Sequence, residues 1–185
     1  MTTERATSPH GQPQVSGDAL IPLRIEQLEA LRAIVGASGI RTDDVAGTLD
    51  SGINESNLDA GVVLFPETLE HVQSIVRYCN SQSISIVPHG GRTGISGGAE
   101  SSIGQVVVQT TRMCGILSFD EDAGTAVVDA GVTLEQLQTV VYPHGLSVGI
   151  DLAARGTATL GGMVSTNAGG TEAFRHGVMR HRVLG

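Results

Sequence analysis

Lysine is absent from this 185-residue chain, and all eleven of its basic residues are arginines. A P-loop and a Schiff-base site both depend on a lysine amine, so neither can be built within these residues. The 11 basic residues are outnumbered by 19 acidic ones, and no basic stripe is visible. Because nucleic-acid binding needs cationic side chains that displace counterions from phosphates, nucleic acid is excluded as a partner. An anionic ligand would have to be held by backbone N–H groups and arginine.

Aromatic residues and cysteines are also scarce. With 3% aromatics and no Trp, the core must be built from aliphatic side chains. Cys79 and Cys114 show neither CxxC nor paired spacing, which predicts two reduced, packed thiols of a cytoplasmic protein. The first residues lack a basic region followed by an apolar stretch, so no secretory signal is expected, and no apolar run is long enough to cross a bilayer.

The first sixty residues divide into a tail and a connector. Residues 1–19 are polar and contain several Pro and Gly, which predicts a disordered tail. Apolar residues at helical spacing predict a helix over 25–35 that the following glycines end. An acidic, turn-rich stretch comes next, so residues 20–60 are assigned to an N-terminal helix and connector.

Residues 61–112 are predicted to form a first α/β subdomain. A short buried strand at 62–65 is followed by a helix that Thr68 caps, and then by a strand at 84–87. The order strand, helix, strand implies that the two strands pair in parallel through a right-handed crossover. A third strand is predicted at 106–109, after a glycine-rich segment.

A second subdomain is predicted over residues 113–185. Two strands, at 115–120 and 126–130, are joined by an acidic turn. Thr133 and Gln136 have the spacing of a capping box for a helix that ends near Gly145.

The end of this subdomain is predicted to be incomplete. A short strand at 146–148 leads into a second glycine-rich segment, and Val183 and Leu184 resemble the start of a further strand. We therefore expect a subdomain that is truncated at its C-terminus.

The first glycine-rich segment, PHGGRTGISGGA at 88–99, directly follows a predicted parallel strand. α/β sheets bind ligands at this end of their strands, and glycine lets consecutive N–H groups turn toward an anion. Arg92, Thr93 and Ser96 would add a cation and hydroxyls to such a site. The spacing matches neither GxGxxG nor the Walker sequence. The alternative is a tight surface loop that uses glycine for its turns.

The second glycine-rich segment, ARGTATLGGMVSTNAGG at 154–170, has paired glycines beside hydroxyl side chains and an amide. Backbone exposed at such pairs can bond the edge of a flat heterocycle, although the segment could equally be a loop packed on the sheet. Two such loops in one chain suit a long ligand with a diphosphate and a ring.

Four segments, in order, carry a resemblance to a known family: PHGGRTGISGGA (88–99), DAGVTLEQL (129–137), DLAARGTATLGGMVSTNAGG (151–170) and RHGVMRHRVLG (175–185). They resemble the FAD-binding PCMH-type domain of the vanillyl-alcohol oxidase family, in the branch of D-lactate, D-2-hydroxyglutarate and glycolate dehydrogenases. The resemblance runs from about residue 60 to the end. It implies an α+β fold in which two α/β subdomains hold an extended FAD and a separate cap domain covers the flavin ring.

The resemblance implies three sets of cofactor contacts. The loop around the FAD diphosphate corresponds to Pro88, His89, Gly90, Gly91, Arg92, Thr93, Gly94, Ile95 and Ser96. Backbone contacts near the adenosine correspond to Ala130, Gly131 and Val132. The ribityl chain and the isoalloxazine would lie along Gly156, Thr157, Gly161, Gly162, Thr166 and Asn167. Within the first loop, His89 either packs the loop or tunes the charge near the ligand.

Two departures from the family bear on the cofactor. Some relatives attach the flavin covalently through a His at the position of Arg92, so non-covalent FAD is expected here. Met163 stands where many relatives have Asn, which would remove a polar contact. The family's acid/base and metal-binding His cluster belongs to the cap region, beyond Gly185. No catalytic residue and no metal ligand is therefore assigned within this chain.

The activity that the resemblance implies is oxidation of a D-2-hydroxy acid to the 2-oxo acid by hydride transfer to flavin. The electrons would then pass to a quinone, a cytochrome or an electron-transfer flavoprotein, and the protein could form a homodimer. The chain would supply the FAD-binding part and be inactive by itself. The alternatives are another FAD-linked oxidase on the same scaffold, such as an aldonolactone or phenolic oxidase, or a catalytically inert flavin-binding fragment.

Overall fold

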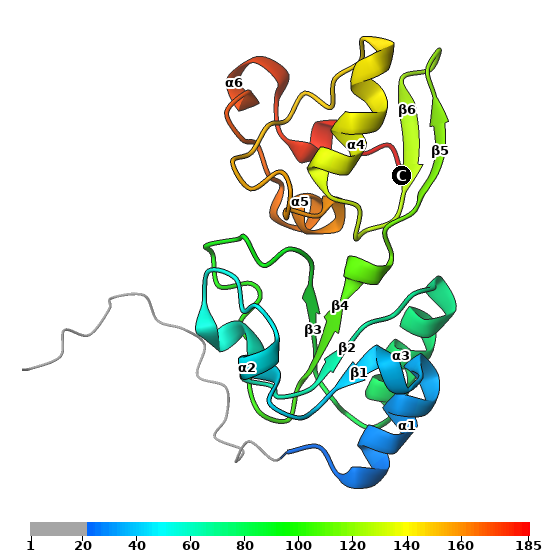
Figure 1. Ribbon diagram of the computed structural model, residues 1–185, viewed down its shortest axis with the longest axis vertical. Helices are drawn as coiled ribbons and strands as arrows, with labels where there is room; N and C mark the ends of the chain where they lie inside the picture. Colours follow the sequence, from blue (N-terminus) through cyan, green and yellow to red (C-terminus); the bar gives the residue numbers. More distant parts are fainter. Residues whose placement is uncertain (1–21) are drawn as a thin grey trace, which may run out of the picture.

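The computed structural model describes residues 22–185, so the tail predicted at 1–19 lies outside the described residues. Figure 1 shows two lobes stacked along the long axis of the molecule. We call residues 22–112 the first lobe and residues 113–185 the second lobe. The chain passes from one to the other directly after the sheet of the first lobe. The architecture is the α+β arrangement of two units that the sequence predicts.

The first lobe contains a four-stranded sheet in the order β1-β2-β4-β3. Its strands are β1 (Ile40–Arg41), β2 (Val63–Leu64), β3 (Ile86–His89) and β4 (Val106–Gln109). β2, β4 and β3 run parallel, and β1 is antiparallel to β2. The predicted direct pairing of β2 with β3 is wrong, because β4 lies between them. All four residues of β4 are buried, which suits the central place in a sheet that is covered on both faces.

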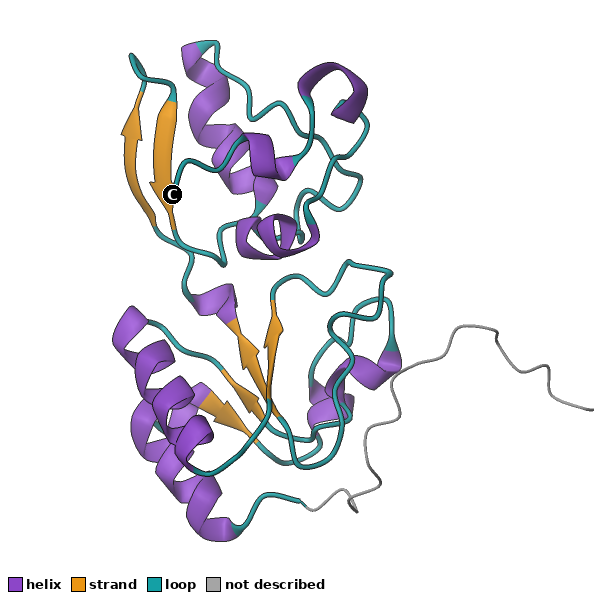
Figure 2. Ribbon diagram, turned by 180° about the vertical axis from the view of Figure 1, so that it is seen from behind, coloured by secondary structure: helices purple, strands orange, loops and turns teal. Residues whose placement is uncertain are grey.

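Helices cover the two faces of this sheet (Figures 1 and 2). α1 (Ile25–Val35) and α3 (Leu69–Ser81) lie on one face, and the short α2 (Val45–Thr48) lies on the other. Val106 and Val108 belong to the apolar cluster beneath α1 and α3, whereas Val107 belongs to the cluster that includes Val45 of α2. The alternation of a strand therefore divides one valine run between two cores.

The sequence signals for α1 and α3 are confirmed. α1 ends at Gly36, which has φ +75°. α3 begins at Thr68, whose hydroxyl accepts a hydrogen bond from the His71 N–H at 3.2 Å. Leu31 of α1 and Ile75 of α3 are fully buried in the same cluster, so the N-terminal helix contributes directly to the core of the first lobe.

The second lobe packs three helices beside a hairpin. The hairpin consists of β5 (Ile116–Asp120) and β6 (Thr125–Val128), and the helices are α4 (Leu134–Val141), α5 (Leu160–Thr166) and α6 (Ala173–His176). The predicted capping box is confirmed: the Thr133 hydroxyl accepts from the Gln136 N–H, and the Gln136 side chain accepts from the Thr133 N–H at 2.8 Å. 3-10 turns complete both lobes at Ala37–Gly39, Glu55–Leu58, Thr110–Arg112, Tyr142–His144 and Met179–His181.

Three local predictions for the second lobe are corrected. The segment 154–170 is not all loop, because α5 forms within it on the Thr159 cap, and Leu160 and Met163 bury one face of that helix. A helix is hard to predict here from the sequence, because two of its seven residues are glycines and each glycine costs about 1 kcal/mol of helix stability relative to Ala. The strands predicted at 146–148 and at 183–184 do not form, because neither segment pairs with another strand in the described part of the chain.

None of the helices described here is both long enough and apolar enough to cross a membrane.

Candidate functional site

A cleft of about 250 Å³ lies where the two lobes meet. The parallel strands β3 and β4 point toward the second lobe, so their carboxyl ends face it (Figure 1). The cleft is lined by Asp50, Gly90, Gly91, Arg92, Gln109, Thr111, Cys114, Gly131, Thr133, Gln136, Gly156, Thr157 and Thr159. Ligands of α/β sheets bind at this end of the strands, and the cleft takes residues from both lobes.

Glycines allow the two lobes to approach each other closely. A Cβ atom at Gly90 would overlap the Thr159 hydroxyl, and a Cβ atom at Gly91 would overlap the Thr157 carbonyl. At Gly131 a Cβ atom would overlap the Thr110 carbonyl of the first lobe. The two glycine-rich segments therefore touch across the cleft, which is the arrangement that one long ligand shared by both loops requires.

The first loop enters the cleft only with its opening residues, Gly90, Gly91 and Arg92. Thr93 is partly buried, and the residues after it lie on the outside of the molecule. The side chain of Ile95 is 89% exposed. Of the nine residues predicted for the diphosphate loop, six do not line the cleft: Pro88, Thr93, Gly94, Ile95, Ser96 and the buried His89.

His89 is a packed residue that joins the two ends of this loop. Its side chain is buried, and Nε2 lies 2.7 Å from the Ala99 carbonyl oxygen. A carbonyl can only accept, so Nε2 carries the proton and donates. Nδ1 is buried and has no hydrogen-bond partner in the described residues. Burial lowers the pKa of His89, and the hydrogen bond to Ala99 partly opposes this. The structure thus favours loop packing over charge tuning by His89.

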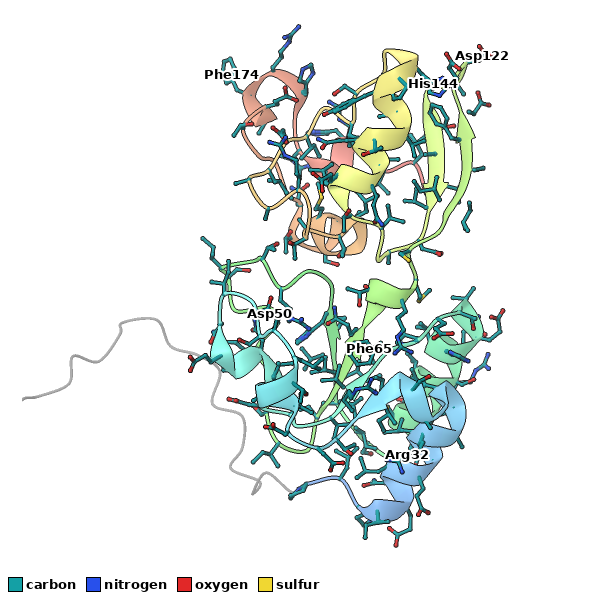
Figure 3. The ribbon with its side chains drawn as sticks, in the orientation of Figure 1. Arg32, Asp50, Phe65, Asp122, His144 and Phe174 are labelled. Atoms are coloured by element: carbon teal, nitrogen blue, oxygen red, sulfur yellow. The ribbon has the colours of Figure 1, made fainter. Side chains whose placement is uncertain are left out.

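Arg92 supplies the positive charge of the cleft. Its backbone is left-handed, with φ +52°, and its carbonyl accepts a hydrogen bond from the Ile53 N–H at 3.3 Å. The guanidinium Nη1 donates to the Gln109 side-chain oxygen at 2.7 Å. Burial lowers the pKa of Arg92, and the field of Asp50 acts in the opposite direction. Figure 3 shows Asp50 in the upper part of the first lobe, on the side that faces the second lobe.

The turn before α4 binds α5 through its backbone. The carbonyls of Ala130 and Val132 accept from the N–H groups of Gly161 and Leu160, both at 2.8 Å. Gly161 must be small, because its Cβ atom would lie 2.7 Å from that of Ala130. Of the three residues predicted near the adenosine, Gly131 lines the cleft and Val132 belongs to the core of the second lobe.

The predicted ribityl and isoalloxazine residues are spread along α5. Gly156 and Thr157 line the cleft, and Gly161 and Gly162 form the first turn of the helix. Thr166 and Asn167 lie at its far end, where their side chains bond the Gly162 carbonyl and the Arg180 N–H. The Thr166 hydroxyl and the Asn167 amide oxygen thus form hydrogen bonds within the second lobe.

Met163, which stands where many relatives have Asn, is a core residue. Its side chain is 2% exposed and belongs to the apolar cluster between α4 and α5. The Met163 side chain is therefore part of the core and does not line the cleft.

Several cleft residues had no functional prediction, among them Asp50, Gln109, Thr111 and Cys114. Gln109 had a usable signal, since it is the polar residue that ends a buried valine strand at its carboxyl end. Cys114 corrects a prediction, because it is exposed in the cleft and not packed. Cys79 is buried as expected, and burial raises the pKa of its thiol.

The composition of the cleft fits a flavin dinucleotide. It combines exposed glycine backbone, the hydroxyls of four threonines and the guanidinium of Arg92, while Arg92 Nε is buried without a partner in the described residues. Backbone N–H groups and a guanidinium bind phosphate oxygens, and glycine backbone accommodates a flat ring. No group of three or more His, Cys, Asp or Glu side chains suited to a metal ion occurs within residues 22–185.

The fold and this cleft define a class of two-lobed α+β domains with a glycine-lined cleft between the lobes. A comparison with protein families identifies the class more closely: residues 60–185 match the FAD binding domain family. The match covers more than half of the chain. The chain therefore belongs to the family of PCMH-type FAD-binding domains.

Curated relatives show the same family. The chain is 42% identical over 123 residues to the D-2-hydroxyglutarate dehydrogenase of Stutzerimonas stutzeri, which covers 66% of this chain and 26% of that protein. It is 41% identical over 124 residues to the mitochondrial D-2-hydroxyglutarate dehydrogenase of Arabidopsis thaliana, covering 67% and 22%. The chain thus spans about a quarter of the length of these relatives.

Solved structures confirm the fold. An alkyldihydroxyacetonephosphate synthase superposes with a TM-score of 0.75 at 20% identity, over 96% of this chain and 35% of that one. A p-cresol methylhydroxylase superposes with a TM-score of 0.63 at 23% identity, over 82% and 32%. At these identities the likeness establishes architecture alone.

Proposed function

We propose that this chain binds FAD non-covalently in the cleft between its lobes and supplies the flavin-binding part of a D-2-hydroxy acid dehydrogenase. The observation that carries the proposal is the contact of the two glycine-rich segments across a cleft in which Arg92 is the basic residue. The names of the relatives from Stutzerimonas stutzeri and Arabidopsis thaliana support a 2-hydroxy acid as the substrate class.

The chain's own residues would bind and orient the cofactor. The backbone of Gly90 and Gly91, with the Arg92 guanidinium, would hold the diphosphate, and Gly156 and Thr157 would contact the part of FAD that lies against the second lobe. Bound FAD would supply the hydride acceptor. The complete protein would then pass electrons to a quinone, a cytochrome or an electron-transfer flavoprotein, in a cytoplasmic enzyme that could be a homodimer.

Flavin uptake tests the first part of the proposal. The purified chain, incubated with FAD and desalted, should retain flavin absorbance, and acid precipitation should release all of it as free FAD. Gly91→Ala should weaken uptake about tenfold or more, because the added methyl group overlaps the Thr157 carbonyl and opens the cleft. Gly98→Ala is the matched control, since a methyl group at that position would have no neighbour within 4 Å. Absence of flavin from folded, unsubstituted protein would contradict the proposal.

Turnover tests the second part. The full-length protein should reduce an artificial electron acceptor with D-2-hydroxyglutarate, D-lactate or glycolate, while residues 1–185 alone should bind FAD without turnover. Flavin binding by a full-length protein that oxidises none of these acids would favour another FAD-linked oxidase or an inert flavin-binding module.

A further inference from the structure

Gln109 connects the end of the sheet to the first glycine-rich loop. It is the last residue of β4, and its side chain is 2% exposed. The amide Nε2 donates to the Gly90 carbonyl at 2.7 Å, and the amide oxygen accepts from Arg92 Nη1, also at 2.7 Å. A carbonyl can only accept and a guanidinium can only donate, so this orientation of the amide is the one that satisfies both partners.

The Gln109 amide accepts a hydrogen bond from Arg92 but is uncharged, so it does not neutralise the positive charge of the guanidinium. In the described residues, no carboxylate forms a salt bridge with Arg92, and Asp50 acts on it only from a longer range. Arg92 Nε is buried without a hydrogen-bond partner. A guanidinium that is partly buried and forms no salt bridge gains from an oxyanion, because charge-assisted hydrogen bonds are the stronger kind.

We propose that Gln109 is a positioning residue, which holds the Arg92 guanidinium in the cleft as an oxyanion-binding group. The inference rests on the proposed function and deepens it. A guanidinium binds a phosphate or a carboxylate through paired N–H groups. The oxyanion is therefore either the diphosphate of the cofactor or the carboxylate of the 2-hydroxy acid, and two probes distinguish them.

Two substitutions at Gln109 distinguish the effect of an added negative charge on anion binding from the effect of a lost hydrogen bond. Gln109→Leu and Gln109→Glu both remove the hydrogen bond to the Gly90 carbonyl, but only the second places a carboxylate against Arg92. A merely structural role predicts that the two variants weaken anion binding equally, or that leucine is worse. The positioning role predicts that glutamate is worse, by about tenfold, because it supplies an internal counter-ion.

The binding of inorganic pyrophosphate and of D-lactate to the chain is measured by titration calorimetry. Gln109→Glu and Arg92→Gln should weaken the same probe, and Gln109→Glu should have a smaller effect in the Arg92→Gln background, because the carboxylate then has no guanidinium to neutralise. Loss of pyrophosphate binding alone assigns the cation to the diphosphate, and loss of D-lactate binding alone assigns it to the carboxylate. Gln105→Glu is the control, because Gln105 lies before β4 and its side-chain oxygen accepts a hydrogen bond from the Ser102 N–H.

The proposal is overturned if the unsubstituted chain binds neither probe, or if Gln109→Leu and Gln109→Glu lose binding equally. These outcomes are independent of flavin uptake. A chain that takes up no FAD, yet binds pyrophosphate in the order expected for these variants, contradicts the proposed function and supports the role of Gln109.

Discussion

His89 shows at the residue scale how burial decides the state of a titratable group. Its Nε2 donates to the Ala99 carbonyl, while its other nitrogen has no partner in the described residues. Protonation would place a second charge near Arg92, whose field also lowers the pKa of His89. The neutral imidazole is therefore the form that the fold accommodates.

The pH dependence of stability should reveal this state. The pKa of His89 is lowered in the folded protein, so in the unfolded chain the imidazole takes up a proton at a higher pH, about 6.5. The stability that this residue contributes is complete above that pH and is lost as the pH falls below it. Urea unfolding at several pH values should show a steeper loss for the unsubstituted chain than for His89→Gln. Parallel curves would contradict the expectation.

Gly131 makes the contact between lobes that a side chain would prevent. Gly131→Ala should lower the free energy of unfolding by about 1–3 kcal/mol, because the added methyl group overlaps the Thr110 carbonyl and the backbone must shift. Gly98→Ala, made in open space, should change it by less than about 0.5 kcal/mol. Chemical denaturation of both variants measures the difference, and equal stabilities would show that the lobes adapt without cost.

At the scale of elements, short helices in the second lobe depend on their caps. α4 and α5 have eight and seven residues, and helices of this length are marginal without tertiary packing. Each begins at a threonine whose hydroxyl accepts a backbone hydrogen bond. Thr133 and Thr159 also line the cleft, so the same residues begin the helices and shape the site.

The capping box of α4 gives a direct test. Thr133→Ala should cost about 0.5–2 kcal/mol of stability, because the Gln136 N–H loses its acceptor at the start of the helix. Thr139→Ala on the same helix is the matched control, since Thr139 is exposed and its hydroxyl donates to the Glu135 carbonyl. Thermal and urea unfolding should separate the two variants. If both lose stability equally, the cap contributes nothing beyond a threonine-to-alanine change.

At the scale of the molecule, each lobe has its own apolar core, and the cleft lies between the two lobes. The clusters of the first lobe contain residues of α1, α2, α3 and its sheet, and the cluster of the second lobe contains residues of α4 and α5. Polar and glycine residues line the cleft between them. A ligand that binds residues from both lobes therefore stabilises an association that the apolar cores alone do not provide.

FAD should accordingly raise the melting temperature of the chain. At a concentration a hundred times its Kd, a ligand that binds only the folded state adds about 2.7 kcal/mol. For a protein of this size that corresponds to a rise of roughly 5–10 °C. Circular dichroism melts with and without FAD measure the shift, and Gly91→Ala should reduce it. No shift at saturating FAD would contradict binding at the interface of the lobes.

Local signals in the amino-acid sequence were enough to predict several elements of the molecule. The α1 and α3 helices, the β4 strand and the capping box of α4 follow from periodicity and from a hydroxyl at the right spacing, and neighbours along the chain decide such features. The four motifs likewise predicted the α+β fold and the family, which the match over residues 60–185 shows.

Features that arise from contacts between residues far apart in the chain could be seen in the folded structure alone. β4 inserts between β2 and β3, α5 forms despite its glycines, and Gln109 bonds two residues of a loop that precedes it by almost twenty positions. Strand order and cleft lining depend on which surfaces are buried together, and no single segment carries that information. The motifs thus give the residue types of the cleft. The arrangement of these residues arises when the two lobes pack together at glycine positions.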